Sequence, residues 1–512
     1  MNFKKWCLAI IALPILVSHI DKDHPGSVRT DHTKPNVLFL IADDWSYPHA
    51  GIYGDKNVRT PTFDWIAQHG ASFSHAFCAA PSCSPSRASI LTSRYPHQLE
   101  SAGNLWSIFP NKFSNWVSIL NEHGYHTGKS RKGWAPGDFE KGGYKHNPAG
   151  KNYESFEDFI QHRKKGQPFS FWFGSSDPHR PYEPNSGVKT GMDRQTVEVP
   201  GFLPDVDCVR NDILDYYYEI ERFDRECGAI LHKIDQMGEL ENTLIIMTSD
   251  NGMPFPRAKA NLYDYGTRMP LAIFWPKGLR DGRNIEEFVN FIDLGPTILE
   301  VANIDIPDDF SGHSVLSLLN GSEDGRPRDH VFVERERHAN VRKGDLSYPS
   351  RGIRTRDYLL IKNFEPDRWP AGDPSTHQSV GQYGDVDNSI SKFLILAGRD
   401  DPDSRRLFDL SFSKRPTIEL YEVKSDPYNL INRAEDPALQ GKKKELLNTL
   451  DAWMSSSGDR RYENPRTNYW DIQVYTPTYQ RSDFNLEQSI ADYKQAKHIG
   501  YGRFELIPCI NE

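Results

Sequence analysis

Residues 83–94 read Cys-Ser-Pro-Ser-Arg-Ala-Ser-Ile-Leu-Thr-Ser-Arg. They place a small, potentially reactive side chain, Cys83, just before a segment that could form a helix. Cys83 offers a thiol, and Pro85 suits the first turn of a helix. If a helix starts here, Arg87 lies one turn beyond the thiol, and its permanent positive charge can support a negative charge at residue 83. A lone cysteine is more often a buried core residue, so the interpretation depends on partners elsewhere in the chain.

Two pairs of oxygen-bearing side chains are such partners. Asp43 and Asp44 follow one apolar run, and Asp250 and Asn251 follow another. Adjacent aspartates bring like charges together, and a divalent cation is the common remedy. Either pair alone would equally suit a helix cap or a turn. Together they predict a metal site, because open α/β sheets bind ligands beyond the carboxyl ends of their strands.

Residues 83–94 resemble the signature of type I sulfatases, in which the cysteine is oxidised after translation to formylglycine. The resemblance implies that residue 83 becomes an aldehyde hydrate, made by a formylglycine-generating or equivalent maturation enzyme. It also implies that Arg87 offsets charge on the hydrate. In this family, calcium (Ca2+) is bound by the formylglycine and four further positions, which match Asp43, Asp44, Asp250 and Asn251, so Cys83 is the fifth ligand.

The same resemblance implies three further catalytic positions. Residues 124–134 are similar to a family segment that ends in Gly-Lys-x-His, and Lys132 takes the position of its lysine. His179 matches the histidine that contacts the scissile oxygen, which makes it the candidate general acid. Lys259, eight residues after Asn251, takes the position of a sulfate-binding cation.

Trp134 departs from the family pattern, because it stands where the family usually has a histidine that handles a proton of the hydrate. Tryptophan has only a donor N–H and cannot accept a proton. We therefore predict that Trp134 binds substrate, its ring packing against a sugar at the mouth of the pocket. The proton acceptor stays open, with His97 and His126 as candidates, although each is more often a structural or surface residue.

The substrate is suggested by segments 177–180, 249–256 and 261–263, which look like the heparan N-sulfatase (sulfamidase) branch of the family. The charged run 334–338 follows a predicted strand and suits recognition of a polar sugar, with Glu336 and His338 as candidate substrate-binding residues. A solvated charge run explains the same pattern equally well.

Alternating apolar runs and helical segments predict an α/β fold. We expect strands at 36–42, 168–173, 243–248, 271–275 and 330–333, with helices at 115–123 and 210–237 between them. The resemblance implies an alkaline-phosphatase-like, mixed but mostly parallel central sheet. After residue 345, short strands at 351–355, 358–361 and 419–423 and a helix around 446–453 predict a smaller antiparallel subdomain. The predicted domains are therefore 35–345 and 346–512.

The N-terminus has Lys4 and Lys5 followed by an apolar run at 6–17, which is typical of a signal peptide over residues 1–20. A polar tail at 21–34 precedes the fold. The run is too short to span a bilayer, so we expect an exported protein with no membrane span. A net charge of -9 argues against nucleic acid as a partner. Four cysteines besides Cys7 and Cys83 make no disulfide scaffold, and their pairing is open.

These observations predict a calcium-dependent sulfatase that hydrolyses sulfate esters or sulfamates on a carbohydrate, of glycosaminoglycan or heparan type. In the chemistry that the resemblance implies, a hydroxyl of the hydrate attacks sulfur. Cations offset charge on the sulfuryl oxygens, and His179 protonates the leaving group. A phosphate or phosphonate monoester hydrolase of the same superfamily would use the same cations. A catalytically silent glycan-binding protein is the other alternative, because Trp134 replaces a catalytic position.

Overall fold

The computed structural model describes residues 34–278, 282–322, 328–375 and 381–473, and these described residues from Pro35 onward form one compact unit. The predicted signal peptide, nearly all of the polar tail, and the last part of the predicted C-terminal subdomain lie outside the described residues. In the part that is described, no helix is both long and apolar enough to cross a membrane.

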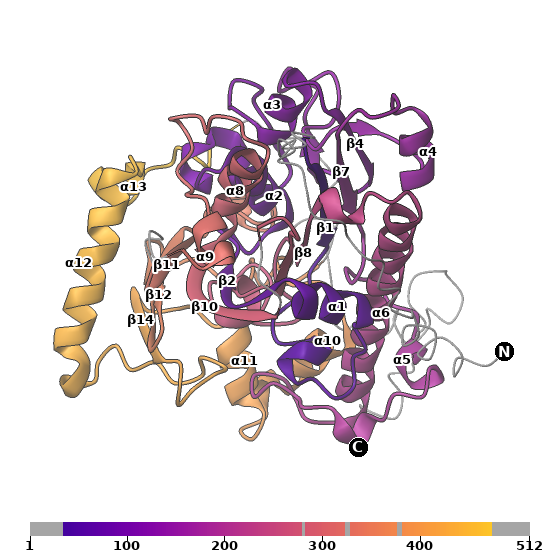
Figure 1. Ribbon diagram of the computed structural model, residues 1–512. Coiled ribbons are helices and arrows are strands. Elements are labelled where there is room, and N and C mark those ends of the chain that lie inside the picture. Colours follow the sequence, from indigo (N-terminus) through magenta and orange to yellow (C-terminus); the bar gives the residue numbers. More distant parts are fainter. Residues whose placement is uncertain (1–33, 279–281, 323–327, 376–380, 474–512) are drawn as a thin grey trace, which may run out of the picture. The chain divides into compact units, whose positions relative to one another are not determined.

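The centre of the fold is an eight-stranded sheet (Figure 1). Its strands are, in spatial order, β10 (Arg283–Asn290), β2 (Ala71–Phe77), β9 (Leu271–Phe274), β8 (Thr243–Ser249), β1 (Asn36–Ala42), β7 (Phe169–Gly174), β4 (His126–Arg131) and β6 (Lys151–Asn152). β9 is antiparallel to both of its neighbours, and every other pairing is parallel. The expected mixed, mostly parallel sheet is therefore confirmed.

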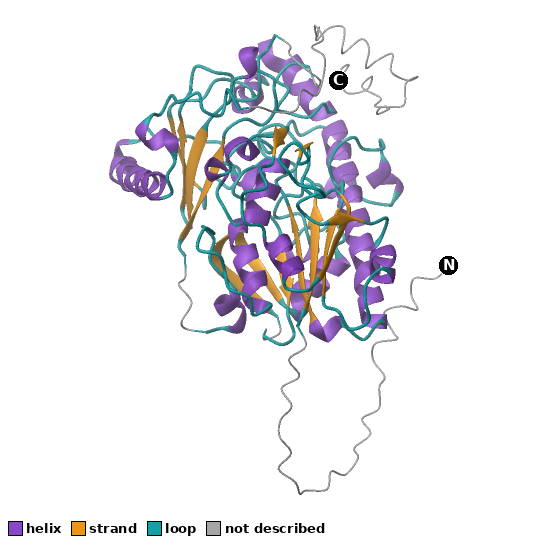
Figure 2. Ribbon diagram, turned by 90° about the horizontal axis from the view of Figure 1, so that it is seen from above, coloured by secondary structure: helices purple, strands orange, loops and turns teal. Residues whose placement is uncertain are grey.

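Helices cover both faces of this sheet (Figure 2). Successive side chains of β1 enter two different hydrophobic cores, with Val37 and Phe39 in one and Leu38 and Leu40 in the other. This alternation explains the continuous apolar run, since a strand buried on both faces has no polar side. The core around Leu38 is closed by α1 (Pro61–His69), α4 (Phe156–Gln161), α6 (Asp207–Gln236), α10 (Ile390–Ala397) and α11 (Arg405–Ser411). The core around Val37 is closed by α2 (Cys83–Thr92), α3 (Trp116–Glu122), α8 (Leu294–Val301) and α9 (Leu316–Asn320).

A second, antiparallel sheet lies beside the first. It consists of β11 (His330–Arg335), β12 (Ser350–Thr355), β13 (Tyr358–Asn363) and β14 (Ile418–Glu422). Helix α12 (Gln440–Ser456) runs alongside these strands (Figure 1), and Leu446 and Leu450 pack in one cluster with Leu360 and Leu420. Besides short 3-10 helices, the remaining elements of the described residues are the short pair β3 (Ser107–Ile108) and β5 (Gly137–Asp138) and the helices α5 (Ser186–Lys189), α7 (Asp264–Thr267) and α13 (Arg460–Glu463).

The placement of one predicted strand was wrong. Residues 330–333 were expected in the main sheet, but β11 pairs antiparallel with β12, His330 opposite Thr355. An apolar run of four residues identifies a buried strand but not its neighbour, because periodicity carries no information on pairing.

The prediction that Trp134 stacks on a sugar at a pocket mouth was also wrong. Its side chain is only 1% exposed and belongs to the core around Val37. The indole Nε1 donates to the carbonyl of Ser84 at 3.0 Å, and the ring packs against Phe109. Gly137 makes room for it, since a Cβ there would lie 2.3 Å from the indole. Trp134 therefore packs in the core and holds the first turn of α2 through the Ser84 carbonyl.

Glu336 is likewise no substrate ligand. It is 1% exposed and binds the guanidinium groups of Arg351 at 2.7 Å and Arg461 at 2.8 and 2.7 Å. Arg351 also binds Asp459 at 2.6 Å, which joins β12 to the segment before α13. The solvated alternative fails too, because residues 334–338 are all buried. A buried ion network, which neither interpretation anticipated, explains the charged run.

Replacing Trp134 tests its structural role. Trp134→Ala should lower the free energy of unfolding by about 3–5 kcal/mol, because a large buried ring leaves a cavity. Trp134→Phe keeps most of the ring and loses one hydrogen bond, so it should cost about 1 kcal/mol. Urea unfolding of both variants measures the difference, and a Trp134→Ala protein as stable as the wild type would contradict the placement.

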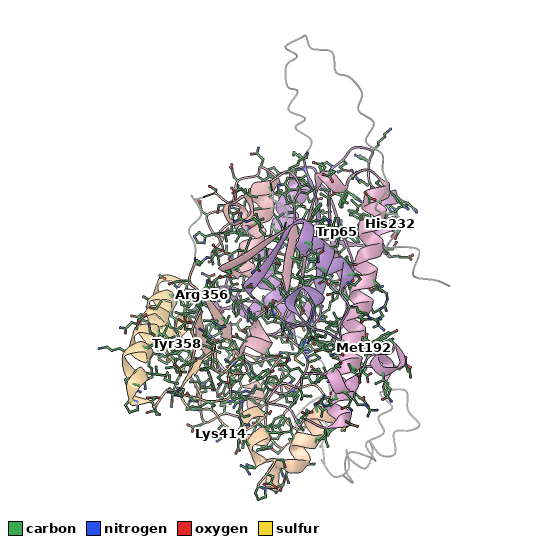
Figure 3. All side chains as sticks on the ribbon, turned by 60° about the horizontal axis from the view of Figure 1, so that its bottom comes forward. Trp65, Met192, His232, Arg356, Tyr358 and Lys414 are labelled. Carbon is green, nitrogen blue, oxygen red and sulfur yellow. The ribbon has the colours of Figure 1, made fainter. Side chains whose placement is uncertain are left out.

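The buried network gives a second stability test. Glu336→Ala should lower the free energy of unfolding by about 3–5 kcal/mol, because two buried arginines lose a carboxylate. The matched control is Glu286→Ala. Glu286 binds Arg356, labelled in Figure 3, at 3.0 Å in a pair whose side chains are 59% and 60% exposed. This exposed pair should contribute less than about 1 kcal/mol. Equal losses in the two variants would refute the buried role of Glu336.

Candidate active site

The candidate site forms where four neighbouring parallel strands end together. Ala42 of β1 lies opposite Ser249 of β8, and Gly174 of β7 lies opposite both Ile41 of β1 and Arg131 of β4. Because parallel strands share one carboxyl edge, the loops that follow them must meet. These loops carry most of the residues that the sequence singled out.

Cys83 is the first residue of α2, and the extended Ser82 precedes it as N-cap. Its Sγ lies 3.4 Å from Oδ1 of Asp43 and 4.0 Å from Oδ1 of Asp44. A backbone hydrogen bond from Ala260 to the carbonyl of Pro81, at 2.9 Å, holds the loop before the helix. Burial raises the pKa of the Cys83 thiol well above its usual value. An unmodified thiol here stays protonated and is a poor nucleophile.

Three carboxylates surround this residue. Ligand atoms of Asp43, Asp44, Cys83 and Asp250 all lie within 4.8 Å of one another. Burial raises the pKa of Asp250 to about 6 despite Arg87, and burial also raises the pKa of Asp44. Burial acts in the same direction on Asp43, but Lys132 and other nearby cations hold its pKa below the usual range. Close carboxylates of this kind call for positive charge.

Three cationic side chains form ion pairs with these carboxylates. Nζ of Lys132 binds Asp43 at 2.5 Å, and Nζ of Lys259 binds Asp44 at 2.7 Å. Nε of Arg87 binds Asp250 at 2.7 Å, and Nη1 of Arg87 also donates to backbone carbonyls at 3.1 Å. Arg87 thus lies behind the carboxylates, whereas the two lysines reach the cavity wall.

Asn251 shows that the site suits a metal ion. Its Nδ2 donates to Asp44 at 2.6 Å and to the carbonyl of Gly252 at 3.1 Å. Its Oδ1 is buried without a hydrogen-bond partner among the described residues. A buried carbonyl oxygen normally has a hydrogen-bond partner. Calcium prefers six to eight oxygen ligands, so an ion held by the three carboxylates would also bind this unpaired oxygen.

His179 lies in the loop after β7. Its Nδ1 contacts the carbonyl of Arg180 at 2.6 Å, so Nδ1 must be the donor and Nε2 faces the acidic groups. Nε2 lies 3.8 Å from Oδ2 of Asp44. Asp387 closes the group, since its carboxylate lies 3.3 Å from Nζ of Lys259 and within 4.8 Å of the ligand atoms of His179 and Asp44.

Asp43 and Asp387 border one cavity of about 810 Å³, within the usual range for ligand pockets, whereas Asp44, Asp250, Asn251 and Arg87 lie behind its wall. Cys83, Lys132, His179 and Lys259 line it, as does His338. The ring of His338 contacts Ser82 Oγ at 2.8 Å, and burial lowers its pKa to about 3, so the ring is neutral.

The two alternative proton acceptors do not reach this cavity, judged on the described residues. His97 is buried against Glu334, with its Nδ1 2.7 Å from the carboxylate. His126 contacts the carbonyl of Phe159 at 3.1 Å and stacks on that ring. Both are structural residues.

The sequence analysis missed other lining residues, among them Trp106, Arg222 and Asp387. Arg222 projects from α6, where its guanidinium binds Asp177 at 2.6 and 2.5 Å. Asp387 precedes α10 in a segment with no motif. Position in the motif 177–180 could have suggested two of the lining residues, Asp177 and Arg180, and Arg180 binds Asp212 at 2.6 and 2.8 Å.

Comparison with known proteins agrees with this geometry. A family model described as Sulfatase matches residues 35–304, which is more than half of the chain. A second model, described as N-sulphoglucosamine sulphohydrolase, C-terminal, matches residues 257–379. Human N-sulphoglucosamine sulphohydrolase is 28% identical over 473 residues, covering 83% of this chain and 90% of that protein. An ulvan-active sulfatase of Formosa agariphila is 26% identical over 468 residues, covering 89% and 86% of the two chains.

A solved structure has the same fold, with a TM-score of 0.61 and 19% identity over 84% of this chain and 99% of the other. It was determined in complex with its substrate, D-glucosamine-2-N,6-O-disulfate. The alkaline-phosphatase-like architecture expected from the sequence is therefore confirmed. Because the family match spans the strand ends from Asp43 to Lys259 that build the cavity, this chain belongs to the sulfatase family and is a sulfuric ester hydrolase.

Proposed function

We propose that this protein removes a sulfate ester or sulfamate group from a carbohydrate of glycosaminoglycan type, as heparan-like glycans carry. The observation that carries the proposal is the placement of Cys83 at the floor of a cavity, among three buried carboxylates and the two lysines of the cavity wall. The similarity to human N-sulphoglucosamine sulphohydrolase supports the substrate class.

Residue 83 needs modification for this role. Burial raises the pKa of its thiol well above the usual value, which disfavours the nucleophilic thiolate. We infer that a maturation enzyme oxidises Cys83 to formylglycine, whose hydrate would supply an oxygen nucleophile. The N-terminal segment is consistent with export from the cell, and we expect the protein to meet both the maturation enzyme and its substrate along that route.

Calcium is the metal that these residues fit. Asp43, Asp44, Asp250 and Asn251 offer oxygen ligands, with residue 83 beside them. The ion would supply positive charge next to the sulfuryl oxygens. Without it, the site has the four carboxylates of Asp43, Asp44, Asp250 and Asp387 against three cations, and it lacks the net positive charge that attracts an anion.

The chain's own residues then orient the substrate. Lys132 and Lys259 line the cavity beside Cys83, where their ammonium groups can bind sulfuryl oxygens. The Nδ1 contact to the Arg180 carbonyl fixes the ring of His179. When the ring carries a proton on both nitrogens, Nε2–H can give its proton to the leaving oxygen or nitrogen, and the ring returns to its neutral form. Arg87 holds Asp250 in place.

Replacing the nucleophile tests the proposal directly. Cys83→Ala should lower kcat/KM on sulfated saccharides by at least about a thousandfold while the fold survives, because the residue is small. Cys227→Ala is the matched control, since Cys227 is also free and buried but lies in α6 outside the cavity. It should keep wild-type activity. Full activity of Cys83→Ala would refute the mechanism.

The same preparation separates the alternatives. Mass spectrometry of the tryptic peptide 60–87 shows whether residue 83 is an aldehyde or a thiol, with Cys78 in the same peptide as an unmodified reference. Assays of sulfate esters against phosphate and phosphonate monoesters distinguish the related hydrolases. A protein that binds saccharides but turns over none of these esters would be a glycan-binding protein.

Metal removal gives a second test. Chelation should abolish activity, and calcium should restore it better than zinc, because the ligands are oxygens. Calcium should also stabilise the fold, by about 2.7 kcal/mol at a hundred times its Kd. Asn251→Ala should weaken this stabilisation, whereas Asn57→Ala, outside the cavity, should keep it. Stabilisation by zinc but not by calcium would overturn the assignment.

A further inference from the structure

Trp106 contributes a large ring to the catalytic cavity. It is half-buried, while its neighbours Leu105 and Ser107 are fully buried. Among the described residues that line the cavity, it is the only one with an extended aromatic carbon surface, since the other two aromatic rings are the imidazoles of His179 and His338 and the rings of Pro136 and Pro181 are small and saturated.

The backbone of Trp106 is strained. Its φ is 57°, in the left-handed region that a bulky side chain seldom occupies. Strain of this kind persists only where the surroundings impose it, and it concentrates at functional sites. Glycine would adopt the same conformation at no steric cost, so the backbone alone does not account for a tryptophan at this position.

The surroundings do impose the conformation. On the N-terminal side, the Leu105 N–H donates to the carbonyl of Arg337 at 3.1 Å, and the side chain of Asn104 accepts from the Arg337 N–H at 3.1 Å. On the C-terminal side, β3 pairs with β5, Ser107 opposite Gly137. Trp106 is therefore held between two fixed points, next to the segment that carries His338 and near the lining residue Pro136.

The rest of the wall is suited to hydroxyl groups. Four charged side chains line the cavity, namely those of Asp177, Arg180, Arg222 and Asp387. A sugar ring has polar edges and an apolar C–H face, so a pocket for it needs both kinds of surface. The polar wall is supplied by these residues, and the flat apolar surface is supplied by Trp106.

We propose that Trp106 is the specificity-determining platform for the sugar ring of the substrate, the role that Trp134 cannot have. The inference rests on the proposed function, because it assumes a sulfated saccharide in this cavity. Trp106 contacts the carbohydrate and not the sulfate group, so it discriminates between a sulfated sugar and a small sulfate.

The test measures binding in the inert Cys83→Ala protein, by calorimetry with N-sulfated glucosamine and, separately, with inorganic sulfate. Adding Trp106→Ala should weaken saccharide binding roughly tenfold, as expected for loss of part of a buried aromatic face, and leave sulfate binding within about twofold. Trp106→Phe should restore most of the saccharide affinity. Trp65→Ala is the control. Trp65, labelled in Figure 3, is a half-buried tryptophan of α1 that stacks on His69 and does not line the cavity.

Trp106→Gly separates a binding role from a structural one. It relieves the left-handed strain, so it should melt no lower than Trp106→Ala and yet lose the same saccharide affinity. If Trp106→Ala binds the saccharide as well as its parent, or loses sulfate and saccharide equally, the platform is refuted and the proposed function stands. If the Cys83→Ala parent binds no sulfated saccharide at all, both proposals fail.

In the active enzyme, Trp106→Ala should raise KM for the saccharide and leave kcat within about twofold, because the lost contact is the same before and during reaction. With a small aryl sulfate, KM should change little. A fall in kcat on both substrates would show that Trp106 positions the reacting group, and would also refute the platform.

Discussion

The burial of three aspartates within reach of one another is the constraint on which this site depends. Asp43, Asp44 and Asp250 are at most 2% exposed, and like charges in such surroundings raise one another's free energy steeply. The fold meets this cost with three cations from separate places, namely α2, the end of β4 and the loop after β8. The position of each element is therefore tied to the charge balance, and a backbone contact from residue 260 to Pro81 joins the loop after β8 to the loop before α2.

This constraint also explains why so much could be predicted from the sequence. A strand buried on both faces reads as an unbroken apolar run, and 36–42 and 243–248 were placed to within one residue. Their shared carboxyl edge then requires the polar residues that follow them to meet. The gathering of Cys83, Lys132, His179 and Lys259 around them could be inferred because each lies in a motif of its family.

The errors have a common physical origin. Charge and hydropathy patterns report what a side chain needs, but not which distant partner satisfies it. The charge of Glu336 is balanced by two buried arginines. The ring of Trp134 packs in the core, where its N–H also has a carbonyl acceptor. The strand at 330–333 pairs with β12 of the small sheet and not with a strand of the main sheet. In each case the partner lies far along the chain or has no local signature.

The cavity thus combines floor residues, which the sequence predicts, with wall residues, which it does not predict. Its floor is dictated by charge balance and ligand chemistry, which admit few residue types, so the reaction class can be recognised from short motifs. Its walls come from segments without a motif, such as those carrying Trp106, Arg222 and Asp387. A sugar can be bound by many arrangements of hydroxyl partners and apolar faces, so these positions leave no fixed pattern. The left-handed backbone of Trp106 is a signal that only the structure provides, because a positive φ at a tryptophan cannot be read from its residue type.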